Sequence, residues 1–223
     1  MKNNYSFTGI FFLILILFSC NAQTKQDSAT ENDGTNFNQE FSQLSINIDS
    51  IILNKAQLWK NTWASFDSFN LTTVKKIDLN EKSSTSENLE KYSNFLIYSP
   101  DSLSVIDLYS YNMDLIIADE DTLVTFDIDS EASLINVETE DRNKILFFGS
   151  SGGFDDAFWL NNNEFIIVGY QELYSEDSDT YTYVPMVWYF DLIKKEISKF
   201  EGTSNNNINS NYFGLRYPTV KME

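Results

Sequence analysis

The segment AFWLNNNEFIIVGY, residues 157–170, is the part of this sequence that decides its fold class. Two apolar runs, 157–160 and 164–170, are rich in aromatic and aliphatic residues and flank the asparagines at 161–163. Aromatic and β-branched side chains favour strands, and asparagine favours the backbone conformations of tight turns. The segment therefore predicts two short strands joined by a turn.

The same pattern of short strands and turns begins at Phe95 and continues toward the C-terminus. Turn residues interrupt it at Ser99-Pro100-Asp101-Ser102, at 139–143 and at 193–196. Residues 203–211 are rich in asparagine and serine and are expected to form a loop. We expect strands at Phe95–Tyr98, Leu103–Tyr111, Leu115–Ala118, Leu123–Ile128, Ala132–Val137, Lys144–Phe148, Ala157–Leu160, Glu164–Tyr170, Met186–Leu192 and Ile197–Phe200, and a final edge strand at Tyr212–Val220.

Residues 37–63 carry the helical signal of the chain. Apolar side chains recur there at helical spacing, namely Phe41, Leu44, Ile48, Ile51, Ile52, Leu58, Trp59 and Trp63. We expect an amphipathic helix that packs on the strand-rich region, and a partner-binding face is the alternative.

Two parts of the strand-rich region share a weak pattern. In the first, Ser99-Pro100-Asp101-Ser102 lies between strands and 132–139 leads to a further strand. In the second, 157–164 lies between strands and 187–192 leads to Lys195-Glu196-Ile197. Each unit spans roughly 50 residues and about four strands, which is the scale of one propeller blade.

Over residues 95–202 this pattern resembles the blades of WD-repeat and Tol-system β-propellers, which implies four-stranded, blade-like sheets. Two blades cannot close a ring, since closed propellers have about four blades or more. We therefore expect a mainly β, β-rich α+β fold. Its N-terminal helix would pack on an open, twisted antiparallel sheet or on two blade-like four-stranded sheets, and not on a closed propeller.

The N-terminus contains an apolar run, 10–18, followed at once by Ser19 and by Cys20, the single cysteine of the chain. This run is shorter than the roughly 20 residues of a spanning helix, so it predicts a removable leader. Leu17-Phe18-Ser19-Cys20 resembles the lipobox of bacterial lipoproteins, and the whole chain is similar to small lipoproteins without an assigned activity. An ordinary secretory leader is the alternative.

The lipobox resemblance implies a division of the chain into three parts. Residues 1–19 would be a signal peptide, 20–36 a lipidated Cys20 with a polar tether, and 37–223 a single β-rich domain. The acyl chains on Cys20 would hold the domain to a membrane of the bacterial cell envelope. Because asparagine rather than aspartate follows Cys20, we expect the outer membrane, facing the periplasm.

The net charge of −18 disfavours nucleic acid as a partner, because phosphate contacts need clustered lysine and arginine. The chain has no histidine, which excludes histidine-based catalysis and most zinc sites. Gly149-Ser150-Ser151-Gly152-Gly153 matches the G-x-S-x-G pattern of hydrolases. A strand rather than the required helix is expected after it, so we interpret it as a turn.

Carboxylates supply the remaining candidate chemistry. The alternate spacing of Asp127, Asp129 and Glu131 begins like a calcium loop, as does that of Asp177 and Asp179, but the glycine and distal glutamate that complete such a loop are missing. We therefore expect no cofactor, with calcium as the alternative. Paired carboxylates could also serve a glycan hydrolase, although no motif selects a pair.

The most distinctive surface candidate is the glycine-flanked loop that contains Ser151, Gly152, Gly153, Asp155 and Asp156. Its glycines permit unusual backbone conformations, and its acids could meet a partner. The sequence thus predicts a membrane-anchored, non-catalytic domain that contacts a protein or a glycan in the envelope. A carboxylate-based glycan hydrolase and a calcium-dependent adhesion module are the alternatives.

Overall fold

The computed structural model describes residues 48–65, 68–83, 89–118, 121–205 and 211–222. The expected leader, Cys20, the tether and the first part of the expected helix lie outside these residues. Residues 48–55 are helical, and α2 (Gln57–Lys60), the 3-10 helix η1 (Leu89–Phe95) and α3 (Tyr212–Arg216) are the other helices of the described part.

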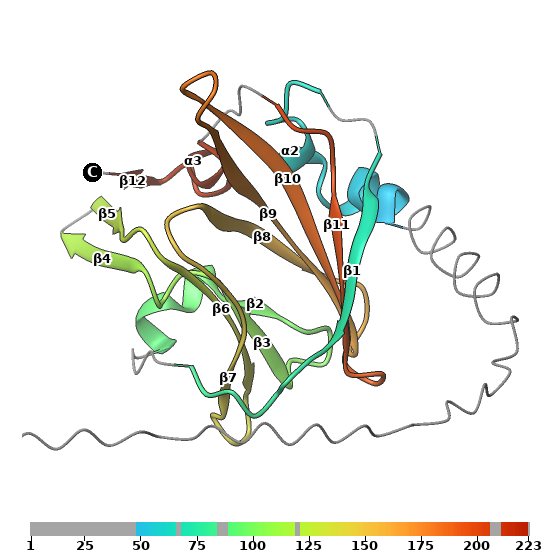
Figure 1. The fold of residues 1–223 in the computed structure, drawn as a ribbon. Helices are drawn as coiled ribbons and strands as arrows, with labels where there is room; N and C mark the ends of the chain where they lie inside the picture. Colours follow the sequence, from blue (N-terminus) through green and yellow to red (C-terminus); the bar gives the residue numbers. More distant parts are fainter. Residues whose placement is uncertain (1–47, 66–67, 84–88, 119–120, 206–210, 223) are drawn as a thin grey trace, which may run out of the picture.

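The strands of the described part form three sheets (Figure 1). A five-stranded antiparallel sheet has the order β1-β11-β10-β9-β8, a four-stranded sheet the order β2-β3-β6-β7, and a three-stranded sheet the order β12-β5-β4. The strands are β1 (Asn70–Lys76), β2 (Ile97–Tyr98), β3 (Ser104–Asp107), β4 (Met113–Ala118), β5 (Asp121–Phe126), β6 (Ser130–Asn136), β7 (Arg142–Phe148), β8 (Gly152–Trp159), β9 (Glu164–Ser175), β10 (Thr180–Asp191), β11 (Glu196–Glu201) and β12 (Val220–Met222).

The core consists of two apolar clusters, one on each face of the five-stranded sheet. Alternate side chains of β9 enter opposite clusters, because successive residues of a strand point to opposite faces. Phe165 and Ile167 belong to the cluster shared with the four-stranded sheet, and Ile166 and Val168 to the cluster shared with the N-terminal helices. All four side chains have no exposed surface, so the first half of β9 is the buried centre of the domain.

This architecture confirms the expected fold class. One sheet has four strands, β2, β3, β6 and β7, whereas β8 to β11 are joined by β1 in a five-stranded sheet. The described residues form open sheets and no closed barrel or propeller. The first unit differs from a simple blade, because the β4–β5 hairpin leaves it and pairs with β12 instead.

Residues 48–63 are the part of the expected helix at 37–63 that the structure describes. In the described residues it is interrupted at Ala56 and ends at Lys60. Its apolar face packs on the sheet as expected, with Ile48, Ile52 and Trp59 fully buried, whereas Leu58 is exposed.

One strand assignment at the C-terminal end of the domain is wrong, and one strand near its start was not predicted. The expected edge strand at Tyr212–Val220 is instead α3 followed by β12; the Asn211 side chain caps α3 by accepting a hydrogen bond from the Gly214 N–H at 3.1 Å. β1 was not expected, because its side chains are almost all exposed and lack apolar alternation. It forms by pairing with β11, a partner distant in sequence.

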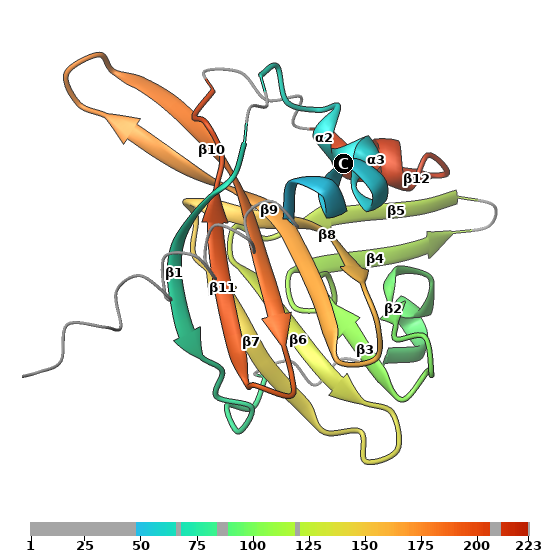
Figure 2. The ribbon, with the colours of Figure 1, turned by 90° about the vertical axis from the view of Figure 1, so that its right-hand side faces the viewer.

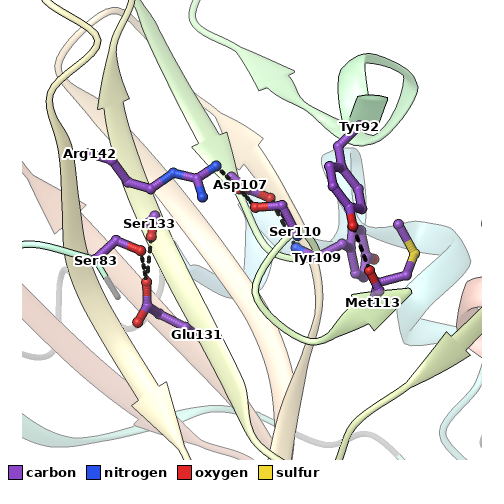
Figure 3. A network of polar contacts seen from close by, with 9 residues as sticks. All are labelled: Ser83, Tyr92, Asp107, Tyr109, Ser110, Met113, Glu131, Ser133 and Arg142. Atoms are coloured by element: carbon purple, nitrogen blue, oxygen red, sulfur yellow. Dashed lines mark hydrogen bonds and ion pairs between the residues drawn. The ribbon is translucent and has the colours of Figure 1, made fainter. Parts of the chain in front are cut away.

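The expected strand Leu103–Tyr111 ends early, at Asp107, for a reason visible in Figure 3. The buried Asp107 carboxylate accepts hydrogen bonds from the N–H groups of Tyr109 and Ser110, at 3.1 and 3.0 Å, and so folds the chain into a turn. Arg142 of β7 forms an ion pair with the same carboxylate. The turn directs the chain toward β4 and places Tyr109 at the junction of the sheets.

A β-bulge in β8 is the feature that creates the candidate site. The register between β8 and β9 shifts between Phe154 and Asp156, which leaves Asp155 as the additional, unpaired residue. The bulge brings the backbones of the two strands close together at Gly169. A Cβ atom at Gly169 would lie 2.1 Å from the carbonyl oxygen of Gly153.

Gly169→Ala is therefore expected to lower the free energy of unfolding by about 3 kcal/mol, because the new methyl group collides with backbone that cannot rotate away. Gly149→Ala is the matched control, since its Cβ would meet only the Asp129 side chain at 3.8 Å. Urea unfolding of both variants measures the difference. Equal stabilities would contradict the close approach of β8 and β9.

Candidate functional site

A pocket of about 330 Å³ lies where β8 and β9 meet the β5–β6 region, α3 and β12. Five aromatic side chains and two carboxyl groups of the described residues line it. The principal lining residues are Tyr109, Phe126, Phe154, Asp155, Tyr170 and Phe213. Because they come from different parts of the chain, the pocket exists only in the folded domain.

The bulge residue Asp155 is held by groups from two other elements. The indole N–H of the fully buried Trp59 in α2 donates to Asp155 Oδ2 at 2.8 Å. The Tyr109 hydroxyl donates to the Asp155 backbone carbonyl at 2.6 Å. Among the described residues, no hydrogen bond reaches Asp155 Oδ1. One carboxyl oxygen is thus fixed, and the other has no protein donor.

Burial raises the pKa of Asp155 to about 7, because a carboxylate loses its hydration in this environment. The Trp59 hydrogen bond opposes this shift of the pKa, and the negative charge of Asp156 reinforces it. Burial also raises the pKa of Tyr170, an effect that the nearby Asp155 increases. At neutral pH the pocket therefore contains a neutral phenol and a carboxyl group that is close to its titration midpoint.

The neighbouring acid, Asp156, has a different environment. Its Oδ2 accepts hydrogen bonds from the Tyr212 hydroxyl at 2.5 Å and from Arg216 Nε at 3.1 Å. Burial raises the pKa of Asp156, while the contacts with Tyr212 and Arg216 oppose that shift. Asp156 therefore joins α3 to β8 and is not free to meet a partner.

Phe213 of α3 organises the aromatic wall. Its ring centroid lies 5.0 Å from that of Phe126, 5.3 Å from that of Tyr109 and 4.9 Å from that of Tyr217. The first two contacts are edge-to-face. This arrangement stabilises a pair of aromatic rings by more than the burial of their surface alone. α3 thus closes one side of the pocket through this packing together with its contacts to Asp156.

Polar groups complete the lining. Asn112, Ser130 and Asp127 line the pocket, and Asp127 is exposed. Asn112 Nδ2 lies 3.4 Å from the Ser130 hydroxyl, and Asn112 Oδ1 is buried with no hydrogen-bond partner among the described residues. An unpaired buried acceptor is costly unless a donor satisfies it.

The structure places the residues of the expected partner-contact loop in three environments. Ser151 is exposed in the turn before β8, and Gly152 and Gly153 begin that strand. Gly152, Gly153 and Asp155 line the pocket, whereas Asp156 is buried against Tyr212 and Arg216. The segment is thus mostly strand rather than loop, because β9 is long enough to pair with residues from 152 onward.

Of the other sequence candidates, Asp127 lines the pocket, and the rest are not assembled into a site among the described residues. A strand follows Ser151, as expected from the sequence, instead of the helix of a hydrolase elbow. Glu131 is buried in β6 and accepts hydrogen bonds from the Ser83 and Ser133 hydroxyls (Figure 3). Among the described residues, no three acidic or cysteine side chains are grouped as metal ligands.

Sequence reasoning missed most of the pocket. Trp59 was expected only as a core residue, and Tyr109, Tyr170 and Phe213 lay in segments interpreted as ordinary strands. The expected partner-contact loop, residues 151–156, was the single local signal that pointed to the site. No local pattern could reveal the rest, because four separate elements contribute these side chains.

Comparisons with models of known families, with curated proteins and with solved structures found no match to this chain. None of the described helices has the length and apolar character needed to cross a bilayer.

The raised pKa of Asp155 predicts a pH dependence of stability. The native state retains a proton that the unfolded chain, with an aspartate pKa near ~3.9, has already released. The contribution of Asp155 to stability therefore falls as pH rises from about 4 to about 7 and is constant above that range. Asp155→Asn should remove this loss and still accept the Trp59 hydrogen bond.

Between pH ~5 and pH ~8 we expect the free energy of unfolding of Asp155→Asn to rise by about 1–2 kcal/mol relative to that of the wild type. This value is reduced for the partial exposure of the carboxyl group. Urea unfolding at both pH values measures the difference in free energy. Asp177→Asn, in the exposed turn after β9, is the control and should parallel the wild type. Parallel curves for Asp155→Asn would show that the pKa of this group is ordinary.

Proposed function

We propose that this protein is a lipid-anchored domain of the bacterial cell envelope that binds a small ligand in the Asp155 pocket without transforming it. Leu17-Phe18-Ser19-Cys20 supports the anchor, and the polar segment 21–36 supports a tether between lipid and domain. The expected site of the anchor is the outer membrane, facing the periplasm.

The pocket is the observation that carries the binding function. Its volume of about 330 Å³ falls within the range of small-molecule sites, roughly 300–1,000 Å³. Such sites use a few polar groups to orient the ligand against apolar and aromatic side chains, and this lining combines aromatic side chains with carboxyl, amide and hydroxyl groups. A glycan partner, expected from the sequence together with a protein partner, could insert one sugar ring here.

A binding role agrees with the polar groups that the pocket contains. The chain has no histidine to activate Ser130 or Ser150, the two serines of the described lining. Asp156, the carboxyl group closest in sequence to Asp155, is already engaged by Tyr212 and Arg216. These groups can orient a ligand but include no pair of nucleophile and histidine base.

The anchor is tested by replacing its attachment atom. Cys20→Ser should move the protein from the detergent phase to the aqueous phase on phase separation, because the acyl chains supply the membrane affinity. Intact-mass measurement of the wild type should show the added lipid. A wild-type protein that is released into the medium without lipid would contradict the proposal.

One observation favours a second function, a carboxylate-based glycan hydrolase. Asp155 keeps a proton near neutral pH, as the general acid of such enzymes must, and Asp127 lines the same pocket. Glycosidases use a carboxyl pair of this kind on either side of the bond that is cleaved.

Incubation with envelope glycans, followed by measurement of new reducing ends, separates the two functions. Binding alone predicts no product with the wild type. A hydrolase predicts product that is lost in both Asp155→Asn and Asp127→Asn, whereas Asp177→Asn retains activity. Product formation of that kind would replace the binding proposal.

A further inference from the structure

The described lining of the Asp155 pocket carries charge of one sign only. Asp127 and Asp155 contribute carboxyl groups, and no lysine or arginine of the described residues lines it. Arg216 lies next to the neighbouring acid and forms an ion pair with Asp156 at 3.1 Å. The whole chain carries a net charge of −18. The pocket therefore attracts cations and repels anions such as phosphates and sugar acids.

The aromatic walls add a second attraction for positive charge. Tyr109, Phe126, Phe154, Tyr170 and Phe213 line the pocket. The faces of aromatic rings carry negative potential, and several rings around one site form the cage that recognises ammonium groups. Sugars also stack on aromatic rings, so the rings alone do not select the ligand. The combination of rings with acids, and without bases, favours a cation.

The third observation concerns the unused hydrogen-bonding capacity of Asp155. Trp59 holds Oδ2, while Oδ1 receives no hydrogen bond from the described residues. Burial disfavours the ionised form and so raises the pKa of this carboxyl group. A protonated amine beside Oδ1 would provide both the missing donor and the missing counter-charge, and a quaternary ammonium group would provide the counter-charge.

We infer that the Asp155 pocket binds a small organic cation, with an ammonium group placed against the Asp155 carboxylate and among the surrounding aromatic rings. This inference rests on the proposed binding function and adds the chemical class of the ligand. The pocket volume of about 330 Å³ restricts the ligand to a small free molecule or to one terminal group of a larger one. We assign it to a free amine or quaternary ammonium compound, because a lipid headgroup would bring a phosphate toward Asp127 and Asp155.

The test compares cations with neutral molecules of the same shape. Isothermal titration of the full-length protein in a non-ionic detergent uses choline against 3,3-dimethylbutan-1-ol, and 1,5-diaminopentane against pentane-1,5-diol. At least one cation should bind at least tenfold more tightly than its neutral counterpart. Phosphocholine should bind more weakly than choline, and equal or tighter binding would overturn the assignment to a free cation.

Matched variants locate the binding site. Asp155→Asn, which keeps the Trp59 contact, should weaken binding of the cation at least tenfold and leave the neutral counterpart unaffected. Tyr170→Phe, which keeps the ring, should bind like the wild type, whereas Tyr170→Leu should lose affinity. Asp177→Asn is the control outside the pocket. Unchanged affinity in Asp155→Asn would overturn the inference even if the cations bind.

The outcomes separate this inference from the proposed function. If cations and their neutral counterparts bind with equal affinity, and Tyr170→Leu weakens the binding of both, the choice of a cation is overturned. The pocket would then remain a binding site. Absence of cation binding at millimolar concentration would also overturn the inference. Absence of cation and neutral binding, together with glycan cleavage that depends on Asp155, would overturn both proposals.

Discussion

The burial of β9 on both faces is the constraint on which the rest of this domain depends. Phe165, Ile166, Ile167 and Val168 have no exposed surface and alternate between two apolar clusters. Such a strand is stable only if another layer covers each face, because four consecutive apolar side chains would otherwise contact water. The four-stranded sheet covers one face, and the N-terminal helices with Trp59 cover the other. Figure 2 shows β9 and β10 continuing past this sandwich as an extended hairpin.

The candidate site follows from the same strand. β8 pairs with β9 along most of its length, and the bulge that absorbs one extra residue leaves Asp155 without a ladder partner. The covering helix layer supplies Trp59 to one carboxyl oxygen, and the turn fixed by Asp107 supplies Tyr109 to the backbone. A partly satisfied carboxyl group among aromatic rings destabilises the native state, and such local costs are frequently found at functional sites.

Local sequence patterns predicted the elements whose structure depends on neighbouring residues. The β6–β7, β8–β9 and β10–β11 hairpins have their connections at 137–141, 161–163 and 192–195, where asparagine, aspartate or lysine residues permit reversal of the chain. Elements that depend on distant partners were missed or misassigned. β1 needs β11, β12 needs β5, and the strand interpretation of 212–216 failed because the Asn211 cap and the Phe213 contacts favour a helix.

The mainly β character of this protein and the apolar face of the N-terminal helix follow from local patterns, because periodicity and turn residues act over a few neighbouring positions. The different environments of Asp155 and Asp156, which are adjacent in the chain, follow from the fold alone. One lies in an aromatic pocket, and the other is bound to Tyr212 and Arg216. The reason is physical: solvation and charge pairing depend on which distant side chains fold around a group, and no local pattern encodes them.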